Sequence, residues 1–218
     1  TLSSSSAASD VYKRQGYMDI LRSIANSEPT PGGGSVAALS LAHAHSLSLM
    51  VARLTLAKDK WAEGHNAARA SVELSEPGLE EAILLAISDS EAFESVISAY
   101  RLPRETEEER EQRSEEIRNA TIGAALAPLN TASSAQKLLS NLEKQSASCN
   151  PNALTDLASA SEMALSAAKI ASLNVRINLE YIEGEDVDLL NSKINKAVEQ
   201  SIKSANNVAL MVNQRLEW

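Results

Sequence analysis

The most constraining feature of this sequence is that its apolar residues recur at helical spacing in segments too long for strands. The clearest such series lies near the end of the chain: Ile194, Val198, Ile202, Ala205, Ala209, Val212 and Leu216. Steps of three and four return side chains to one face of an α-helix. No segment alternates apolar and polar residues as a half-buried strand does, and no internal repeat is visible. The pattern therefore predicts an all-α fold.

Composition supports this fold class. Of the 218 residues, 44% are hydrophobic and only 3% aromatic, and alanine, leucine and serine dominate. Alanine and leucine favour helices, whereas strands favour aromatic and β-branched residues. We therefore expect one domain over residues 16–218, an antiparallel bundle of five to six long helices. The many small residues permit close helix packing, so we also expect the protein to form a homodimer through helix faces.

Breaks in the pattern divide the chain into predicted helices. The predicted ranges are 17–27, 35–63, 67–101 with an interruption at Pro77-Gly78, 105–142 with a kink at Pro128, a helix from the turn at 148–152 to 182, and one from 186 onward. The helix at 35–63 is apolar all round, which predicts a buried helix. The segment 105–118 is densely charged, which predicts a solvated helix face.

Charge and cysteine usage exclude several classes of function. The formal net charge is -9 and no lysine or arginine cluster is present, so we expect no nucleic-acid partner. No apolar stretch looks long and charge-free enough to span a bilayer, so we expect no membrane partner. Cys149 is the only cysteine, which excludes an internal disulfide and a thiolate zinc cage and favours a reducing, cytoplasmic location. Residues 1–15 are rich in serine and alanine and have no hydrophobic signal core, so we expect a disordered or non-native leader.

The run Thr30-Pro-Gly-Gly-Gly-Ser-Val-Ala-Ala38 precedes the long apolar helix. Its glycines allow positive φ and close backbone approach, and Ser35 is placed as the helix N-cap. A glycine turn at a helix N-terminus presents free N–H groups to an anion. The same residues also make an ordinary tight turn between packed helices, so the motif leaves both interpretations open.

One carboxylate falls in an apolar row. Asp89 belongs to a helical row whose other members are apolar or aromatic: Ala82, Ala86, Phe93, Val96 and Tyr100. Desolvation in such a row raises the pKa of a carboxyl group and suits it to proton transfer. Asp89 could instead accept a structural hydrogen bond.

A second apolar row contains polar residues. Its members are Asp156, Ala160, Met163, Ala167, Ile170, Asn174, Ile177 and Tyr181. Asp156 also suits the first turn of a helix, where it answers the helix dipole. Asn174 and Asn178 lie one turn apart in a helix interior, where asparagine is unfavourable. These amides indicate either polar contacts between helices or recognition of a heterocycle's amide edge.

The histidines do not indicate a metal site. His43 and His45 are two residues apart and do not share a helix face, and only His65 remains. His43 falls on an apolar row of the 35–63 helix, which predicts a packed core histidine. Lys58 lies near the end of that helix, where it complements the helix dipole or meets a ligand carboxylate. Cys149 has no nucleophile motif around it, so we expect a buried or turn cysteine.

Several distinctive motifs follow one another in order along the chain. The motifs are Pro31-Gly-Gly-Gly-Ser-Val-Ala-Ala38, Met50-Val-Ala-Arg-Leu-Thr55 with Lys58, Asp89-Ser-Glu-Ala-Phe93, Arg101-Leu-Pro-Arg104, Ala127-Pro-Leu129, the turn from Asn150 to Asp156, and Asn174-Val-x-Ile-Asn-Leu179. Together they resemble the cyclodeaminase/cyclohydrolase family of folate enzymes. The family includes the C-terminal domain of formiminotransferase-cyclodeaminase and stand-alone methenyltetrahydrofolate cyclohydrolases. The resemblance extends from Gly16 to the C-terminal end.

This resemblance implies an all-helical homodimer acting on a one-carbon unit of tetrahydrofolate without a metal or redox cofactor. It implies that Asp89 is the catalytic acid/base. The residues implied in substrate binding are Gly32, Gly33, Gly34, Ser35, Lys58 and Arg101 for the glutamate tail, and Asp156, Asn174 and Asn178 for the pterin.

The resemblance leaves two reactions open. One hydrolyses 5,10-methenyltetrahydrofolate to 10-formyltetrahydrofolate, and the other expels ammonia from a formimino group. We expect no formiminotransferase domain ahead of residue 16, an expectation that favours the hydrolysis. The departures from the family pattern are Ala57, where glycine is frequent, and His43 and His45, where small residues are usual. A non-catalytic helical dimer that binds folate or a protein partner is the third possibility.

Overall fold

The computed structural model describes residues 16–218 and is helical throughout its regular structure. The helices are α2 (Tyr17–Ile24), α3 (Gly33–Leu56), α4 (His65–Tyr100), α5 (Glu107–Ser146), α6 (Leu154–Leu179) and α7 (Glu185–Leu216), with short 3-10 turns at η1 (Asp59–Gly64) and η2 (Pro151–Ala153). No strand occurs within 16–218. The predicted all-α bundle is confirmed, with five long helices and one short one. The predicted leader at 1–15 lies outside the described residues.

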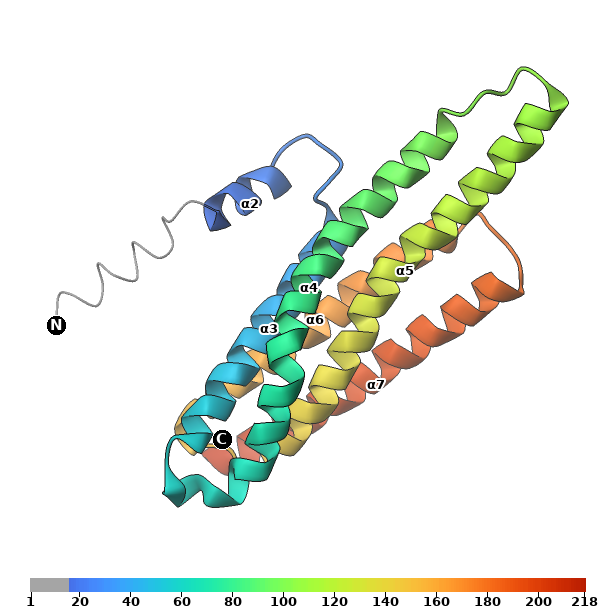
Figure 1. Ribbon diagram of the computed structural model, residues 1–218. Coiled ribbons are helices and arrows are strands. Elements are labelled where there is room, and N and C mark those ends of the chain that lie inside the picture. Colours follow the sequence, from blue (N-terminus) through green and yellow to red (C-terminus); the bar gives the residue numbers. More distant parts are fainter. Residues whose placement is uncertain (1–15) are drawn as a thin grey trace.

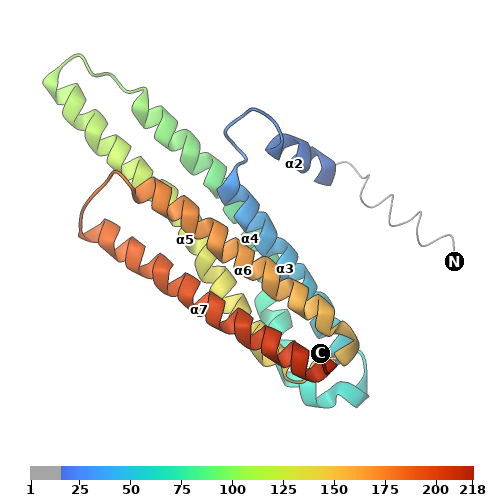
Figure 2. The same ribbon diagram turned by 180° about the vertical axis from the view of Figure 1, so that it is seen from behind.

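Helices α3 to α6 form an antiparallel ring in which each helix packs on the next and α6 closes onto α3 (Figure 1). Helix α7 packs outside this ring against α5 and α6. The C-terminus lies at the same end of the bundle as the α3–α4 connection (Figures 1 and 2). The core at that end is filled by aliphatic side chains such as Leu138, Leu142 and Leu157, all fully buried.

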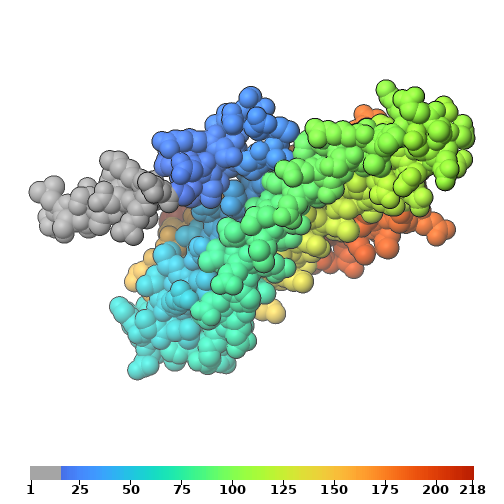
Figure 3. All heavy atoms as spheres, turned by 45° about the horizontal axis from the view of Figure 1, so that its top comes forward, coloured from blue at the N-terminus to red at the C-terminus, as the bar shows by residue number. Residues whose placement is uncertain are grey.

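Helices α4 and α5 are longer than their neighbours, with 36 and 40 residues against 24 in α3 and 26 in α6. At 1.5 Å per residue, they project roughly 15 Å past the start of α3. Figure 3 shows this green and yellow-green tip extending beyond the rest of the molecule. Between residues 87 and 123 only Ala99 is buried, so the tip is solvated, as the charged segment 105–118 predicts.

Several predicted helix boundaries differ from the structure, and the largest differences are at Pro77 and at the end of α3. Helix α4 is continuous through Pro77, because Pro77 lies on the solvent face, where water can bond the carbonyl that loses its partner. Helix α3 ends at Leu56 rather than at 63, and a 3-10 turn follows. Helix α5 runs through Pro128 and begins with a capping box between Thr106 and Glu109.

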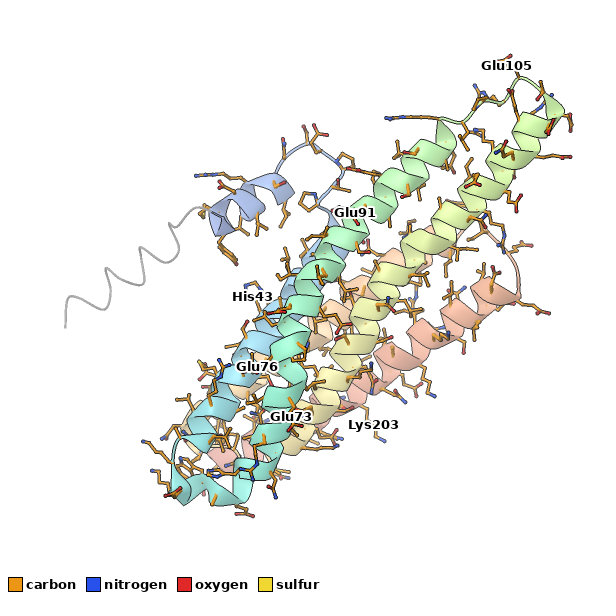
Figure 4. The ribbon with its side chains drawn as sticks, viewed as in Figure 1. His43, Glu73, Glu76, Glu91, Glu105 and Lys203 are labelled. Carbon is orange, nitrogen blue, oxygen red and sulfur yellow. The ribbon has the colours of Figure 1, made fainter. Side chains whose placement is uncertain are left out.

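The predicted core position of His43 is wrong. His43 is exposed and points outward (Figure 4), with its Nδ1 2.7 Å from the Leu39 carbonyl oxygen. His45 is the buried one, only 1% exposed. The row through His43 also contains Met50 and Leu54, which are 38% and 44% exposed, so α3 is not buried all round. The error arises because neighbouring helices cover three sides of α3 and leave this row on the fourth.

Helix α3 is also long and apolar enough to pass a test for a membrane span, contrary to the expectation from the sequence. In the structure 61% of its apolar window is buried inside the bundle, between α4 and α6. A central helix of a packed bundle satisfies the same criteria. The apolar character of α3 is therefore explained by its place in the core.

The C-terminal helix presents a slightly different face from the predicted one. Ile194, Ala205 and Val212 are buried as expected, but Ile202 is 38% exposed. Val187, Leu190 and Val208 are buried as well.

Cys149 is buried, and burial raises the pKa of its thiol. Arg215 near the end of α7 donates to the carbonyl oxygens of Ser146 and Cys149, which ties α7 to the α5–α6 turn.

Candidate active site

The glycine run begins α3, but Ser35 is not its N-cap. Gly32 is the N-cap residue, Gly33 is the first helical residue, and Ser35 lies in the first turn. The predicted N-cap is therefore wrong by three residues. The reason is that the Ser35 hydroxyl has partners on α4, to which it is turned, rather than on its own helix.

Asp89 packs directly against the backbone of Gly34. A Cβ atom on Gly34 would lie 2.0 Å from Asp89 Oδ1 and 2.7 Å from Oδ2. Contacts that short do not occur, so only glycine admits the carboxylate here. The carboxylate thus sits beside the N-terminal turn of α3, whose positive dipole end favours a negative charge.

Ser35 fixes the orientation of this carboxylate. Its hydroxyl lies 3.0 Å from Asp89 Oδ2, 3.2 Å from the Ala86 carbonyl oxygen and 3.3 Å from the Ser90 hydroxyl. Burial raises the pKa of Asp89 above its ordinary value, and the bonds from Ser35 oppose the rise. Asp89 is half-buried, so it combines a raised pKa with access to a substrate.

Asn174 joins this cluster from α6. A Cβ atom on Gly33 would lie 3.4 Å from Asn174 Nδ2, and the same amide nitrogen donates to the Ile170 carbonyl oxygen. Asn178, one turn later, donates to the Ala124 carbonyl oxygen on α5. The Asn178 amide therefore makes an interhelical contact, one of the two interpretations open from sequence, and both side chains remain half-buried.

Arg101 lies farther along the same helix as Asp89, about 18 Å away at helical rise. It lines a cavity of about 410 Å³ together with Thr30 and Phe93, beside the glycine run. Gly32 contacts the same loop, because a Cβ atom there would lie 3.1 Å from the Pro29 carbonyl oxygen. Arg101 and the glycine run thus border one side of the site.

The structure does not bring Lys58 and Asp156 to this place. Lys58 follows the far end of α3, roughly 33 Å from Gly34 along the helix. Asp156 lies in the first turn of α6, roughly 27 Å from Asn174. A row on a helix shows which residues share a face but not how far apart they lie along the bundle axis. Because α3 and α6 each run the length of the bundle, residues on one row can lie at its opposite ends.

Sequence reasoning missed two contributions to the site. Ser90 was not singled out, although it directly follows Asp89 and its hydroxyl reaches Ser35. The glycine run was expected to present N–H groups and to allow close backbone approach, but not to make room for Asp89, which the missing side chain of Gly34 does. Within 16–218, no group of three or more His, Cys, Asp or Glu side chains lies close enough together to hold a metal ion.

A half-buried carboxylate at a glycine helix start, next to amide side chains, is suited to moving protons at a polar substrate. Residues 17–200 match the family model described as formiminotransferase-cyclodeaminase. The chain therefore belongs to the formiminotransferase-cyclodeaminase family.

Individual relatives agree with this assignment. A methenyltetrahydrofolate cyclohydrolase from Methylorubrum extorquens is 34% identical over 164 residues, which cover 75% of this chain and 78% of that one. A formimidoyltransferase-cyclodeaminase from Gallus gallus is 26% identical over 197 residues, 90% of this chain but only 36% of that longer protein.

A solved structure is similar across its whole length. The crystal structure of formiminotetrahydrofolate cyclodeaminase from Thermotoga maritima aligns with a TM-score of 0.77 and 27% identity. The alignment covers 94% of this chain and 97% of that one. The predicted family and all-helical fold class are therefore confirmed.

Proposed function

We propose that this protein hydrolyses 5,10-methenyltetrahydrofolate to 10-formyltetrahydrofolate, with Asp89 as the general acid/base. The observation that carries the proposal is the Asp89 carboxylate, half-buried against Gly34 and oriented by Ser35. The similarity to a cyclohydrolase over 78% of that enzyme's length supports the choice of reaction.

In the proposed reaction, the Asp89 carboxylate takes a proton from water as the water oxygen bonds to the methenyl carbon. The adduct carries a hydroxyl on a carbon bound to both N5 and N10. Protonated Asp89 then gives its proton to N5 as the C–N5 bond breaks. Loss of the hydroxyl proton completes the formyl C=O, and one proton is released overall. A carboxyl group with a raised pKa suits both halves of this cycle.

The other proposed contacts follow from position. The amides of the glycine run face the substrate, Asn174 meets the pterin, and Arg101 attracts the glutamate tail. Lys58 and Asp156 have no role in this proposal, since they lie at the other end of the chain's bundle. The chemistry uses only these side chains and water, so we propose no cofactor.

Formiminotetrahydrofolate cyclodeaminase activity is the second candidate, because the Thermotoga maritima protein of that name matches nearly its full length. The same carboxyl group would then protonate the amino group as its bond to the one-carbon unit breaks, so that it leaves as ammonia. Spectrophotometric loss of the methenyl absorbance and ammonia release from the formimino substrate, measured side by side, separate the two reactions. Folate binding without either turnover would indicate the non-catalytic alternative.

The catalytic role of Asp89 can be tested against a control substitution at a nearby carboxylate on the same helix. We expect Asp89→Asn to lower kcat by 10²–10⁴-fold, the usual range for a general acid/base. Glu91→Gln removes an exposed carboxylate on α4 (Figure 4) and should leave turnover unchanged. Hydrolysis by Asp89→Asn at the wild-type rate would refute the catalytic role, and absence of both activities in the wild type would refute the proposed function.

We also propose a homodimer in the cytoplasm. Large apolar side chains remain exposed on α4, where Leu84 and Ile87 are 65% and 51% accessible, and such surface favours association. Sedimentation equilibrium at micromolar concentration measures the state directly, and a monomer at that concentration would contradict the proposal. A reducing location agrees with the single buried Cys149.

A further inference from the structure

The apolar rows on α4 and α6 lose their cover where α3 begins. On α4 the row is fully buried at Ala82, but Phe93 and Tyr100 are 36% and 55% exposed. On the α6 side Ala167 is buried, but Ile177 and Tyr181 are 59% and 86% exposed. The change occurs at Asp89 and Asn174, level with the first turn of α3. Because these two apolar rows continue beyond the start of α3, which covers them elsewhere, they leave an exposed apolar surface that is suited to binding a ligand.

Both uncovered rows line one groove of about 810 Å³ between α4, α5 and the end of α6. Figure 2 shows that α4 and α5 extend past the start of α3 and the end of α6, where this groove lies. Its apolar lining consists of Val96, Tyr100, Ile117, Ile177, Tyr181 and Ile182. The volume lies within the range of small-molecule sites.

The groove lies beyond Asp89, toward the tip of α4 and α5. Val96 lies about 10 Å farther along α4 than Asp89, on the same face. Ser71 bonds to Asn141 at 2.6 Å and Arg113 bonds to the Tyr100 carbonyl oxygen at 3.1 Å, which sets the register of α4 against α5. In that register Glu115 lies roughly 12 Å from the level of Asp89, toward the tip. A bicyclic ring held at Asp89 by its reacting edge can thus extend into the groove.

The polar rim of the groove is acidic. Glu111 and Glu115 line it, and neither takes part in an ion pair within residues 16–218. Its only lining cation, Arg118, is held by Asp186 at 2.8 Å and by the Glu183 carbonyl oxygen at 3.0 Å. A free carboxylate accepts hydrogen bonds from adjacent N–H groups and repels other carboxylates. The rim therefore favours an N–H-bearing ring and disfavours the glutamate tail.

We propose that this groove binds the 2-amino-4-oxo-pteridine ring of the folate substrate, an inference that rests on the proposed function. The ring packs between Val96 and Tyr181, and the Glu115 carboxylate accepts from the 2-amino group and the adjacent ring N–H. The p-aminobenzoylglutamate half then leaves Asp89 along a different face of α4, toward Arg101 and the loop at Thr30. Asp89 lies where the two halves of the substrate meet, at the one-carbon bridge.

The test separates the two halves of the substrate. Calorimetry or inhibition of turnover measures the affinities of four ligands. They are 6-methyltetrahydropterin, p-aminobenzoylglutamate, and tetrahydrofolate with one or with three glutamates. We expect Glu115→Gln to weaken the pterin and both folates by roughly 10-fold, equally for one and three glutamates, and to leave p-aminobenzoylglutamate unchanged. Arg101→Gln should do the opposite and affect the longer tail more.

Glu116→Gln is the matched control, because Glu116 is the next residue on α5 but lines a different cavity, with Gln112 and Ala120. It should bind all four ligands as the wild type does. Two results would overturn the inference and leave the proposed function standing. In the first, neither Glu115→Gln nor Tyr181→Ala changes the affinity for folate. In the second, Glu115→Gln weakens the pterin fragment and p-aminobenzoylglutamate equally. A wild type that neither binds nor converts any folate would overturn the proposed function itself.

Discussion

At the scale of single residues, the site depends on an absent side chain as much as on a present one. Asp89 approaches the backbone of α3 because Gly34 has no Cβ, and Ser35 then holds one carboxylate oxygen. Burial raises the pKa of Asp89, while the Ser35 bonds act against it. Each of these effects can be removed by one substitution.

The first residue-scale prediction concerns Gly34. We expect Gly34→Ala to displace the Asp89 carboxylate and to lower kcat by at least 10²-fold, because a small misplacement of a catalytic group has effects of that size. Gly123→Ala is the control, since a Cβ atom there meets nothing within 4 Å. That change should keep activity and stabilise α5 by up to about 1 kcal/mol. Steady-state kinetics and thermal unfolding measure both, and equal activity of the two variants would contradict the assignment.

The second residue-scale prediction concerns the pH dependence of hydrolysis. Asp89 must be ionised to accept a proton from water, so kcat/KM falls at low pH with the pKa of Asp89 in the free enzyme. Ser35→Ala removes bonds that lower this pKa and should move the acidic limb to higher pH. Ser133→Ala, which loses only a bond to the Leu129 carbonyl oxygen, should leave the profile in place. An acidic limb at the same pH in all three proteins would show that Ser35 does not act on Asp89.

At the scale of elements, α3 and α4 pack through a histidine and a glycine. A Cβ atom on Gly78 would lie 2.4 Å from His45 Cε1, so the imidazole occupies the space that Gly78 leaves. Neither ring nitrogen of His45 has a hydrogen-bond partner among the described residues. Burial lowers the pKa of His45 from 6.5 to about 4, which keeps the ring neutral in the folded protein.

This pair predicts a loss of stability in acid. The unfolded chain binds a proton at His45 below pH 6.5, whereas the folded chain does so only near pH 4. The contribution of neutral His45 is therefore fully present above pH 6.5 and is lost as pH falls toward 4, to a total of about 3 kcal/mol. Urea unfolding of wild type and His45→Leu from pH 7 to 4 measures it. The variant should lose less stability than the wild type, and His43→Gln, changed at the exposed ring, should follow the wild type.

At the scale of the whole molecule, stability is unevenly distributed. The end of the bundle that holds the α3–α4 connection and the C-terminus, here called the closed end, is filled by buried leucines. The tip of α4 and α5 has almost no buried side chain. Helical segments with few buried contacts open more readily than the core. The proposed ligand groove lies on this tip, so binding would order the least stable part of the protein.

Hydrogen exchange should report this difference. We expect amides in 95–118 to exchange faster than those in 37–52 and 135–142, because the latter segments are rich in buried side chains, whereas only Ala99 is buried in the former. Tetrahydrofolate should slow exchange in 95–118 and at 174–182, measured by mass spectrometry. Protection confined to the closed end of the bundle would contradict both the stability gradient and the placement of the ligand.

Much of the fold could be predicted from the sequence, because helical periodicity and helix breakers are local. The long helices, the solvated face at 105–118 and buried Cys149 were all predicted. The interruption at Pro77 and the core position of His43 were wrong, since both depend on which neighbour covers which face. Of the site, the sequence singled out Asp89 and the glycine run but also included Lys58 and Asp156, which lie at the other end.

The sequence alone determined the class of fold, the family and the position of Asp89 in an apolar row, because these depend on residue type and spacing within one helix. Only the tertiary structure decided which row members share a height in the bundle. Helix length, register and the start of α3 bring Gly34, Ser35 and Asn174 to Asp89 and leave the groove beyond them uncovered. Those relations are set by packing between helices, which no local period specifies.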